Sequence, residues 1–395
     1  MTDGSRGALD GLVVLDLSRI LAGPTCTQLL GDLGATVWKV ENPATGGDDT
    51  RAWGPPFVTG ADGGNTDLSA YFLCANRNKS SIALDLARED GQATARAMAA
   101  RADVVIENWK PGSLAKYGLD HATLCARHPG LVYCSISGFG QTGPNRDKPG
   151  YDLMAQGYGG VMSLTGPVEG PPMKVGVGIA DVMCGMYAAV GILAALRHRD
   201  RTGEGQHIDL SLVDAQIAWT INEGTNYLLS GKVPERRGND HPNIVPYGVF
   251  AGSDGHVIVA VGNDAQFARF CDAFGLAGLA EDPRFATNPG RIAHREALLA
   301  VLRPALAQVP AAEIVGRLET RKVPVGPIQD MAQVFASDQV AARGMLFRME
   351  GPSGPLHLIG NPLKLSRTPV RYAKAPPACG ADSETIRALI SDQPD

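Results

Sequence analysis

Short runs of branched apolar residues alternate with helical segments through the first 140 residues, and this alternation constrains the fold more than any other feature. Residues 11–17 form the first apolar run, and Ala22-Gly23-Pro24 then begins a helix that extends to about Leu33, since proline is favoured in a first helical turn. A second strand follows over 35–41, and the order strand, helix, strand favours a parallel sheet. The same order repeats further along the chain, with a strand at 81–86, a helix at 89–101, and strands at 104–107 and 131–137. The sequence therefore predicts the α/β class with a large doubly wound domain.

The chain has 395 residues, which exceeds the size at which one hydrophobic core usually keeps growing, so more than one domain is expected. We assign residues 1–200 to the large α/β domain and residues 201–230 to a linker that contains a helix from Val213 to Ser230. Apolar alternation on both sides of Ser253-Asp254-Gly255 predicts a β-hairpin, and mostly helical residues follow it. Residues 231–325 are therefore expected to form a smaller α+β domain, and residues 326–395 to return to the large domain.

The composition limits the class of partner. A net charge of −5 and an isoelectric point near 5.9 argue against nucleic acid or an anionic membrane as the main partner. The seven cysteines are dispersed without a Cys-x-x-Cys pair, and the eight histidines lack ligand spacing, so neither a disulfide framework nor a metal site is indicated. We expect no apolar run long enough to span a bilayer, and residues 1–11 lack the apolar core of a signal peptide. A cytoplasmic location fits these features best.

Asp181 is the candidate catalytic residue. It follows Gly176 and Gly178 and precedes a long apolar run, so we expect it in the first turn of a helix that extends to about Arg199. Free N–H groups and the positive end of the helix dipole should keep such a carboxylate ionised. Glycines beside it let the backbone pass close to a ligand, and an ionised carboxylate can attack an activated carbonyl. The alternative is an ordinary helix-capping aspartate with no chemical role.

Two further segments indicate a ligand site, and one indicates against a common cofactor. Gly138 to Gly143 matches the dinucleotide fingerprint, but Pro144 to Pro149 follows where a helix would have to begin, so a Rossmann cofactor is not expected. Arg77 and Lys79 belong to a short polar segment that is either a solvated turn or an anion site. The segment 108–116 follows a strand end, the usual ligand edge of an open sheet, and it offers Asn108, Trp109 and Lys116 for contacts to a base or a phosphate.

These residues together resemble the class III CoA-transferases, a family that includes formyl-CoA transferase, carnitine CoA-transferase and the acyl-CoA racemases. The resemblance covers nearly the whole chain, and within the family it is strongest to the branch that uses succinyl-CoA and glutarate. It implies two chains threaded through each other as interlocked rings in a homodimer. The segments that carry it are 16–24, 31–35, 39–41, 78–81, 107–112, 138–140, 150–152, 180–181, 202–206 and 325–327, with 47–57 and 244–247 for the closer similarity.

The resemblance also implies a mechanism. Asp181 would attack the thioester of a donor acyl-CoA to form a mixed anhydride, and the released CoA would convert it to an aspartyl-CoA thioester. The acceptor acid would then take the CoA, so a CoA thioester is a substrate and no permanently bound cofactor is needed. A loop that includes Gly238 and His241 would shield the intermediates, although Asn239 and Asp240 stand where the family has a glycine run.

The residues that the resemblance assigns to CoA binding lie mostly in the first 140 positions. Two departures from the family pattern matter, because Asn42 and Ser137 stand where basic residues are expected, so phosphate contacts could come from Arg77, Lys79 or Lys110. The full set of predicted CoA contacts is Ile20, Leu21, Arg77, Lys79, Asn108, Trp109, Lys116, Ser137 and Phe139.

Three alternatives stay open at this point. Racemases of the family carry a histidine where this chain has Tyr151, and a phenol with a pKa of about 10 is a poor base at neutral pH, so transfer is favoured over racemisation. A non-catalytic CoA-binding protein is disfavoured by the presence of Asp181. The acceptor could be glutarate, oxalate, mesaconate or itaconate.

A cation should hold the acceptor's second carboxylate, and the candidates are Arg77 first, then Arg51, Arg236 and Arg237.

Overall fold

The computed structural model describes residues 7–391, and these residues divide into two compact units. The first unit comprises the chain up to Val161, Lys174–Lys232 and the chain from Gln339 onward. The second unit comprises Met162–Met173 and Val233–Asp338. Residues 1–6 and 392–395, which the sequence analysis placed in its first and last domain segments, lie outside the described residues.

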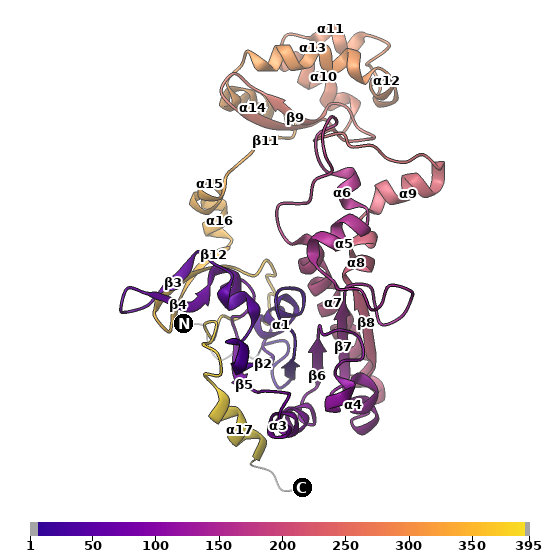
Figure 1. The fold of residues 1–395 in the computed structure, drawn as a ribbon. Helices are drawn as coiled ribbons and strands as arrows, with labels where there is room; N and C mark the ends of the chain where they lie inside the picture. Colours follow the sequence, from indigo (N-terminus) through magenta and orange to yellow (C-terminus); the bar gives the residue numbers. More distant parts are fainter. Residues whose placement is uncertain (1–6, 392–395) are drawn as a thin grey trace. The chain divides into compact units, whose positions relative to one another are not determined.

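The first unit is built on a six-stranded parallel sheet (Figure 1). Its strands follow the order β5-β2-β1-β6-β7-β8, so the chain reverses its direction of winding between β1 and β6. This confirms the predicted α/β class with a parallel sheet. In such sheets the crevice at the carboxyl ends of the two strands that flank the reversal is the usual ligand site. The strand bounds are Val13–Asp16 for β1, Thr36–Glu41 for β2, Lys79–Ala83 for β5, Val104–Glu107 for β6, Val132–Ser137 for β7 and His207–Ser211 for β8.

Helices cover both faces of this sheet, because the strands carry apolar side chains on both faces. Helix α1 (Ala22–Asp32) packs on α7 (Ile179–Thr202), and both share a core with Val14 and Ile106 on one face. Helix α3 (Glu89–Ala99) and helix α4 (His121–Arg127) pack on the opposite face, where Leu15 and Tyr133 are buried. Helix α17 (Ser383–Ser391) contacts α3 and β5, so the end of the chain joins this second layer.

One predicted helix is divided in two. The sequence predicts a single helix from Val213 to Ser230, whereas α8 (Leu212–Ala218) ends before Trp219 and α9 begins at Ile221, whose φ is +32°. Further short elements complete the unit: η1 (Pro43–Thr45), η2 (Asp49–Ala52), β3 (Phe57–Thr59), β4 (Asn65–Ser69), α2 (Ala70–Leu73), η3 (Ala115–Tyr117), α5 (Asp152–Tyr158), α9 (Ile221–Ser230) and the hairpin β12 (Leu346–Gly351) with β13 (Gly354–Ile359).

The second unit has its own core. The predicted hairpin is confirmed, since β9 (Tyr247–Ala251) pairs antiparallel with β10 (His256–Ala260), and β11 (Val325–Pro327) pairs with the other edge of β10. Phe250, Phe267 and Leu302 are among the residues buried between this sheet and the helices. The helices are α6 (Val161–Leu164), α10 (Asp264–Ala273), α11 (Ala277–Glu281), α12 (Asn288–Ala293), α13 (Arg295–Ala307), α14 (Ala311–Thr320) and α15 (Met331–Ala336). Helix α16 (Asp338–Ala342) begins at the last residue of this unit, and its remaining residues belong to the first unit.

Helix α7 corrects one expectation from the sequence. It is 24 residues long with a hydropathy of 1.9 in its most apolar window, so by length and composition it could cross a membrane, contrary to the prediction that no apolar run is long enough. In this fold the helix contacts α1, α5 and α8 as well as the strands β7 and β8, and 44% of that window is buried. Its apolar composition therefore matches its place in the core of the first unit.

Candidate active site

A cavity of about 450 Å³ lies at the reversal point of the sheet, entirely within the first unit. The loop after β1 contributes Arg19 to Ala22, and the loop after β6 contributes Asn108 to Pro111. The end of β7 and the first residues of α5 and α7 complete the walls. We call this cavity the switch-point pocket. Asp181 lines it, so the candidate nucleophile and the ligand edge of the sheet coincide.

Asp181 lies in the first turn of α7, as predicted, but the start of that helix is capped by another residue. The carboxylate of Asp152 accepts a hydrogen bond from the backbone N–H of Ala180 at 2.8 Å and a longer one from the N–H of Asp181 at 3.4 Å. The side chain of Gln156 holds this carboxylate by donating to it at 2.7 Å, and its carbonyl oxygen accepts the N–H of Val175. Helix α5 therefore fixes the segment that leads into Asp181.

The charge state of Asp181 differs from the prediction. Burial and, to a smaller extent, the nearby negative charge of Asp152 together raise the pKa of its carboxyl to about 7. The expectation that the helix N-terminus holds Asp181 firmly ionised was wrong, because Asp152 occupies the N–H groups and adds a like charge. A carboxyl of this kind is ionised above neutral pH and retains more basicity than an ordinary aspartate, which suits attack on an acyl group.

One aromatic side chain, Tyr71, lies near the same carboxyl. Burial and the charges of Asp181 and Asp152 raise the pKa of Tyr71 to about 12, which places this phenol within electrostatic range of Asp181. Trp53 meets Tyr71 edge to face, with ring centroids 5.1 Å apart. The sequence analysis did not mark either ring, since only their proximity in space connects residues 53 and 71 to residue 181.

Six of the residues that the sequence analysis assigned to substrates line the switch-point pocket: Ile20, Leu21, Asn108, Trp109, Ser137 and Tyr151. Asn108 binds both backbone groups of Arg19, at 3.0 Å to the N–H and 2.7 Å to the carbonyl. The indole N–H of Trp109 donates to the carbonyl of Leu17 at 2.8 Å. The loops after β1 and β6 therefore brace each other across the reversal point.

Arg77 and Lys79 do not line this pocket, which corrects the predicted anion site. The guanidinium of Arg77 makes two hydrogen bonds to Asp32, at 2.8 and 2.6 Å, and is buried beside the ring of Tyr372. The ammonium of Lys79 is fully buried and donates to Asp16 and Asn76. Because both cations already bind carboxylates or amides in the core, they hold the fold together and leave the ligand to other residues.

Other predicted residues also lie elsewhere. Lys116 rests over the ring of Tyr117, and Phe139 packs edge to face on Tyr158, so neither lines the pocket. Arg51 forms a buried ion pair with Glu41. Gly238, His241 and Arg236 belong to the second unit, where His241 packs against Tyr247 and Arg236 donates to the carbonyls of Pro167 and Gly170. Arg237 belongs to the same unit.

Three cations line the switch-point pocket: Arg19, Lys110 and Lys148. Of these, the sequence analysis named only Lys110, as a possible phosphate contact. The exposed side chain of Arg19 pairs with Asp49 at 2.9 Å, and that of Lys110 approaches Asp147 at 3.9 Å. Exposed ion pairs of this kind are weak and exchange readily with other anions. The position of Arg19 directly after β1 is the signal that could have identified it.

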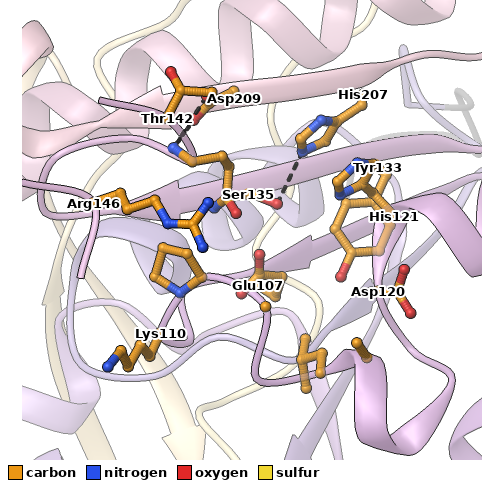
Figure 2. Close-up of a pocket in the computed structure, with 15 residues that line it drawn as sticks. Glu107, Lys110, Asp120, His121, Tyr133, Ser135, Thr142, Arg146, His207 and Asp209 are labelled. Carbon is orange, nitrogen blue, oxygen red and sulfur yellow. Dashed lines mark hydrogen bonds between the residues drawn. The ribbon is translucent and has the colours of Figure 1, made fainter. Parts of the chain in front are cut away.

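A second cavity of about 430 Å³ shares Lys110 and Pro111 with the switch-point pocket, and Lys110 is its only lining residue that the sequence analysis considered for substrate binding (Figure 2). Glu107 is at its centre, and burial raises the pKa of this carboxyl to about 7. The carboxylate accepts the backbone N–H of Trp109 at 2.7 Å. His207 binds the hydroxyl of Ser135 and stacks on His121 with ring centroids 3.8 Å apart. The buried carboxylate of Glu107 therefore helps to fix the loop after β6, which also lines the switch-point pocket.

Among residues 7–391 there is no group of three or more histidine, cysteine, aspartate or glutamate side chains that could hold a metal ion.

A comparison with protein families identifies the chain. The model of CoA-transferase family III matches residues 9–383. The chain belongs to CoA-transferase family III. A succinate–glutarate CoA-transferase of Agrobacterium fabrum is 47% identical over 393 residues, which cover 99% of this chain and 98% of that protein. An acetyl-CoA:oxalate CoA-transferase of Acetobacter aceti is 41% identical over 362 residues, covering 91% and 90%.

Solved structures agree with this assignment. A CAIB/BAIF family protein from Brucella suis has 46% identity and a TM-score of 0.86, and the match covers 98% of this chain and 100% of that one. The protein is thus a CoA-transferase, an enzyme that uses CoA thioesters as substrates. In this CoA-transferase the switch-point pocket gathers a buried carboxyl, two aromatic walls and three cations at one edge of the sheet.

Proposed function

We propose that this CoA-transferase moves CoA from succinyl-CoA to a dicarboxylic acid such as glutarate, with Asp181 as the nucleophile. The observation that carries the proposal is the carboxyl of Asp181 in the switch-point pocket, with a pKa raised to about 7 by burial and by Asp152. The similarity to a succinate–glutarate CoA-transferase supports the choice of donor and acceptor.

The proposed chemistry exchanges one acyl bond for another. The carboxylate of Asp181 attacks the thioester carbonyl, the carbon–sulfur bond breaks, and CoA leaves as a thiolate from a succinyl-aspartyl anhydride. The thiolate attacks the aspartyl carbonyl and expels succinate, which leaves an aspartyl-CoA thioester. The acceptor carboxylate attacks this thioester, and the released thiolate then attacks the acceptor carbonyl to give acceptor-CoA and free Asp181. The acyl bonds balance, so the cycle consumes no nucleotide triphosphate.

Each addition step places a negative charge on an oxygen, which requires hydrogen-bond donors. Helix α1 begins at the pocket without a side-chain cap, since its N-cap residue is Leu21. Its first backbone N–H groups are therefore candidate donors. The N–H groups of Ala180 and Asp181 are weaker candidates, because they already donate to Asp152.

We assign the anionic groups of the substrates to Arg19, Lys110 and Lys148, in place of Arg77 and Lys79. Replacing one charge-assisted contact costs about 1.5–3 kcal/mol, which is roughly one to two decades in efficiency. Lys148→Met should therefore raise the KM of either the CoA thioester or the acceptor acid by that order. Lys116→Met is the matched control outside the pocket, and an equal effect of the two substitutions would contradict this assignment.

The sequence analysis left several acceptors open. Oxalate is the second acceptor to test, because an acetyl-CoA:oxalate CoA-transferase is 41% identical, and mesaconate and itaconate follow. Racemisation of an acyl-CoA remains disfavoured, because Tyr151 lines the pocket where the racemases have a histidine base. We further propose a homodimer with the interlocked ring arrangement, located in the cytoplasm.

An exposed apolar surface supports the proposed homodimer. Helices α5, α7, α8 and α9 contact one another in sequence, and large apolar side chains stand out from all four. Leu228 and Leu229 are 82% and 87% exposed. Contiguous apolar surfaces of this kind mark interfaces between chains. The exposed side chains are Leu153, Met154, Tyr158, Met186, Tyr187, Val190, Leu193, Ile217, Trp219, Ile221, Tyr227, Leu228 and Leu229.

A donor and acceptor screen with purified protein tests the function. Succinyl-CoA and glutarate should give glutaryl-CoA and succinate, and hydroxylamine added during turnover should leave a hydroxamate on the peptide that contains Asp181. Asp181→Asn should lower transfer by roughly 10⁴-fold or more while CoA still binds. Asp200→Asn, at the other end of the same helix, is the matched control. Full activity of Asp181→Asn, or an unmodified Asp181 during turnover, would exclude this mechanism.

A further inference from the structure

The loop that leaves β1 contains an isoleucine in a conformation that isoleucine rarely adopts. The φ of Ile20 is +72°, in the left-handed region, where a β-branched side chain collides with its own backbone. Residues in this region persist only where the surroundings hold them, and they concentrate at functional sites. Ile20 lines the switch-point pocket, so the question is which groups hold it.

Asp48 holds the peptide of Ile20. Both oxygens of its carboxylate lie 3.2 Å from the backbone nitrogen of Ile20. The same carboxylate accepts the backbone N–H and the hydroxyl of Thr50, at 3.0 and 2.8 Å, and the ammonium of Lys39 at 2.8 Å. The side chains of Asp48 and Lys39 are fully buried. Although burial opposes ionisation, Lys39 and these hydrogen bonds lower the pKa of Asp48 to about 2, so the carboxylate stays charged.

The neighbouring peptides are held in the same way. The ammonium of Lys39 also donates to the carbonyl of Ser18 at 3.0 Å. Asn108 accepts the N–H of Arg19 and donates to its carbonyl. Consecutive residues of the loop after β1 are therefore fixed by side chains from three other segments: β2, the residue before η2 and the residue after β6.

The loop in turn supports the turn that carries Asp181. A Cβ atom added at Gly178 would lie 3.1 Å from a methyl carbon of Leu21, and one added at Gly185 would lie 2.5 Å from the carbonyl oxygen of Ala22. Leu21 and Ala22 thus pack directly against the start of α7. If Ile20 adopted an ordinary negative φ, the backbone would change direction immediately before Leu21 and Ala22. Their contacts with Gly178 and Gly185 would then be disturbed.

We propose that Asp48 and Asn108 are positioning residues, which keep Ile20 in its left-handed conformation and so shape the wall of the switch-point pocket opposite Asp181. This inference rests on the proposed CoA-transferase reaction at that pocket. It predicts that the loss of kcat/KM caused by replacing Asp48 or Asn108 is smaller when residue 20 can adopt the left-handed conformation without strain.

The test compares glycine with alanine at position 20 in three backgrounds. Both substitutions remove the isoleucine side chain, but only glycine adopts a positive φ freely. With Asp48 and Asn108 intact, Ile20→Gly and Ile20→Ala should have similar kcat/KM for succinyl-CoA. With Asp48→Asn, the Ile20→Gly variant should be roughly five- to thirtyfold more active than the Ile20→Ala variant, since the left-handed conformation penalises alanine by that factor. Asn108→Ala should give the same preference for glycine.

The Asn108→Ala background protects the test against a folding failure, because Asn108 lies outside the buried charges of Asp48 and Lys39. Equal activity of the glycine and alanine variants in every background that folds would overturn the proposal and leave Asp48 as a structural partner of Lys39 alone. Hydrogen exchange of the Ile20 amide gives a readout that needs no transfer activity. Exchange should be slow in the wild type and at least about tenfold faster in Asp48→Asn or Asn108→Ala. A wild type without transfer activity would refute the proposed function. The exchange rates would still show whether Asp48 and Asn108 hold the Ile20 peptide in place.

Discussion

The carboxyl of Asp181 gives the proposed reaction a defined pH dependence. Because burial and Asp152 raise its pKa to about 7, the attacking carboxylate forms only as the pH rises through that value. We expect kcat/KM for succinyl-CoA to increase about tenfold per pH unit below pH 7 and to level off above it. Asp152→Asn removes the like charge, so the midpoint should move to lower pH. A profile that is flat from pH 5 to 8 would contradict the role of Asp181.

Arg77 is expected to matter for stability and not for the acceptor. Its guanidinium makes a buried two-point contact with Asp32, and removal of one partner of such a pair costs about 3–5 kcal/mol. Arg77→Met should therefore lower the free energy of unfolding by that amount, as measured by denaturant titration. The control is Arg88→Met, whose ion pair with Asp90 is exposed and whose loss should change stability by less than about 0.5 kcal/mol. An unchanged stability together with a raised acceptor KM would restore the original assignment.

At the scale of elements, the close approach of α1 and α7 depends on one glycine. A Cβ atom at Gly185 would lie 2.5 Å from the carbonyl oxygen of Ala22, so Gly185→Ala should separate the helices and destabilise the protein by about 1–3 kcal/mol. Gly191 lies in the same helix, with its nearest neighbour at an ordinary 3.5 Å. Gly191→Ala should therefore be neutral or stabilising by up to about 1 kcal/mol. Thermal unfolding of the two variants checks the contrast, and equal effects would refute it.

The elements themselves were largely predictable, because local periodicity determines them. The parallel strands, helices α1 and α7 and the hairpin of the second unit follow directly from apolar runs and turn residues. The break between α8 and α9 was missed, since no glycine or proline precedes Ile221. Helix α17 (Ser383–Ser391) was not predicted either.

The site was less predictable than the fold, because its contacts join residues that are distant in the chain. Asp181 and the loop from Ile20 to Leu21 were found by position and resemblance. The partner of Arg77 is Asp32, 45 residues earlier, and the cap of α7 is Asp152, which precedes Asp181 by 29 residues. No spacing rule links such pairs. From the sequence alone, an arginine in a polar segment is therefore easily assigned to a ligand site, because its buried partner, here Asp32, is not apparent.

At the scale of the whole molecule, an interlocked homodimer should not exchange subunits. Two closed rings separate only if one of them unfolds, so dimers mixed from tagged and untagged protein should stay unmixed for days under native conditions. Mass spectrometry of the intact assemblies gives the result, and refolding a mixture from denaturant is the control that should produce mixed dimers. Rapid exchange without denaturant, or a folded monomer at nanomolar concentration, would exclude interlocking.

The apolar surface on α9 offers a mutational test of the same assembly. Leu228→Glu combined with Leu229→Glu places two negative charges at the two most exposed apolar side chains of the proposed interface. We expect the variant to assemble poorly after refolding, as measured by light scattering, because a buried unpaired charge opposes association. Val301→Glu on α13 is the control at an exposed apolar position outside that surface. Normal assembly of the double variant would place the interface elsewhere.

The discontinuity of the first unit has a consequence for the order in which the protein can be made. Arg51 donates to the carbonyl of Pro377, Asn78 to that of Arg371, and Asn361 to the carboxylate of Asp32. These contacts join the first hundred residues to the last forty, whereas most of the second unit is a continuous insertion between them. During synthesis the inserted unit can fold while the ribosome still holds the final segment. The unit that contains Asp181 can be completed only after residues 361–377 have been synthesised, so a chain that stops before residue 361 should contain a folded insert and an incomplete catalytic unit.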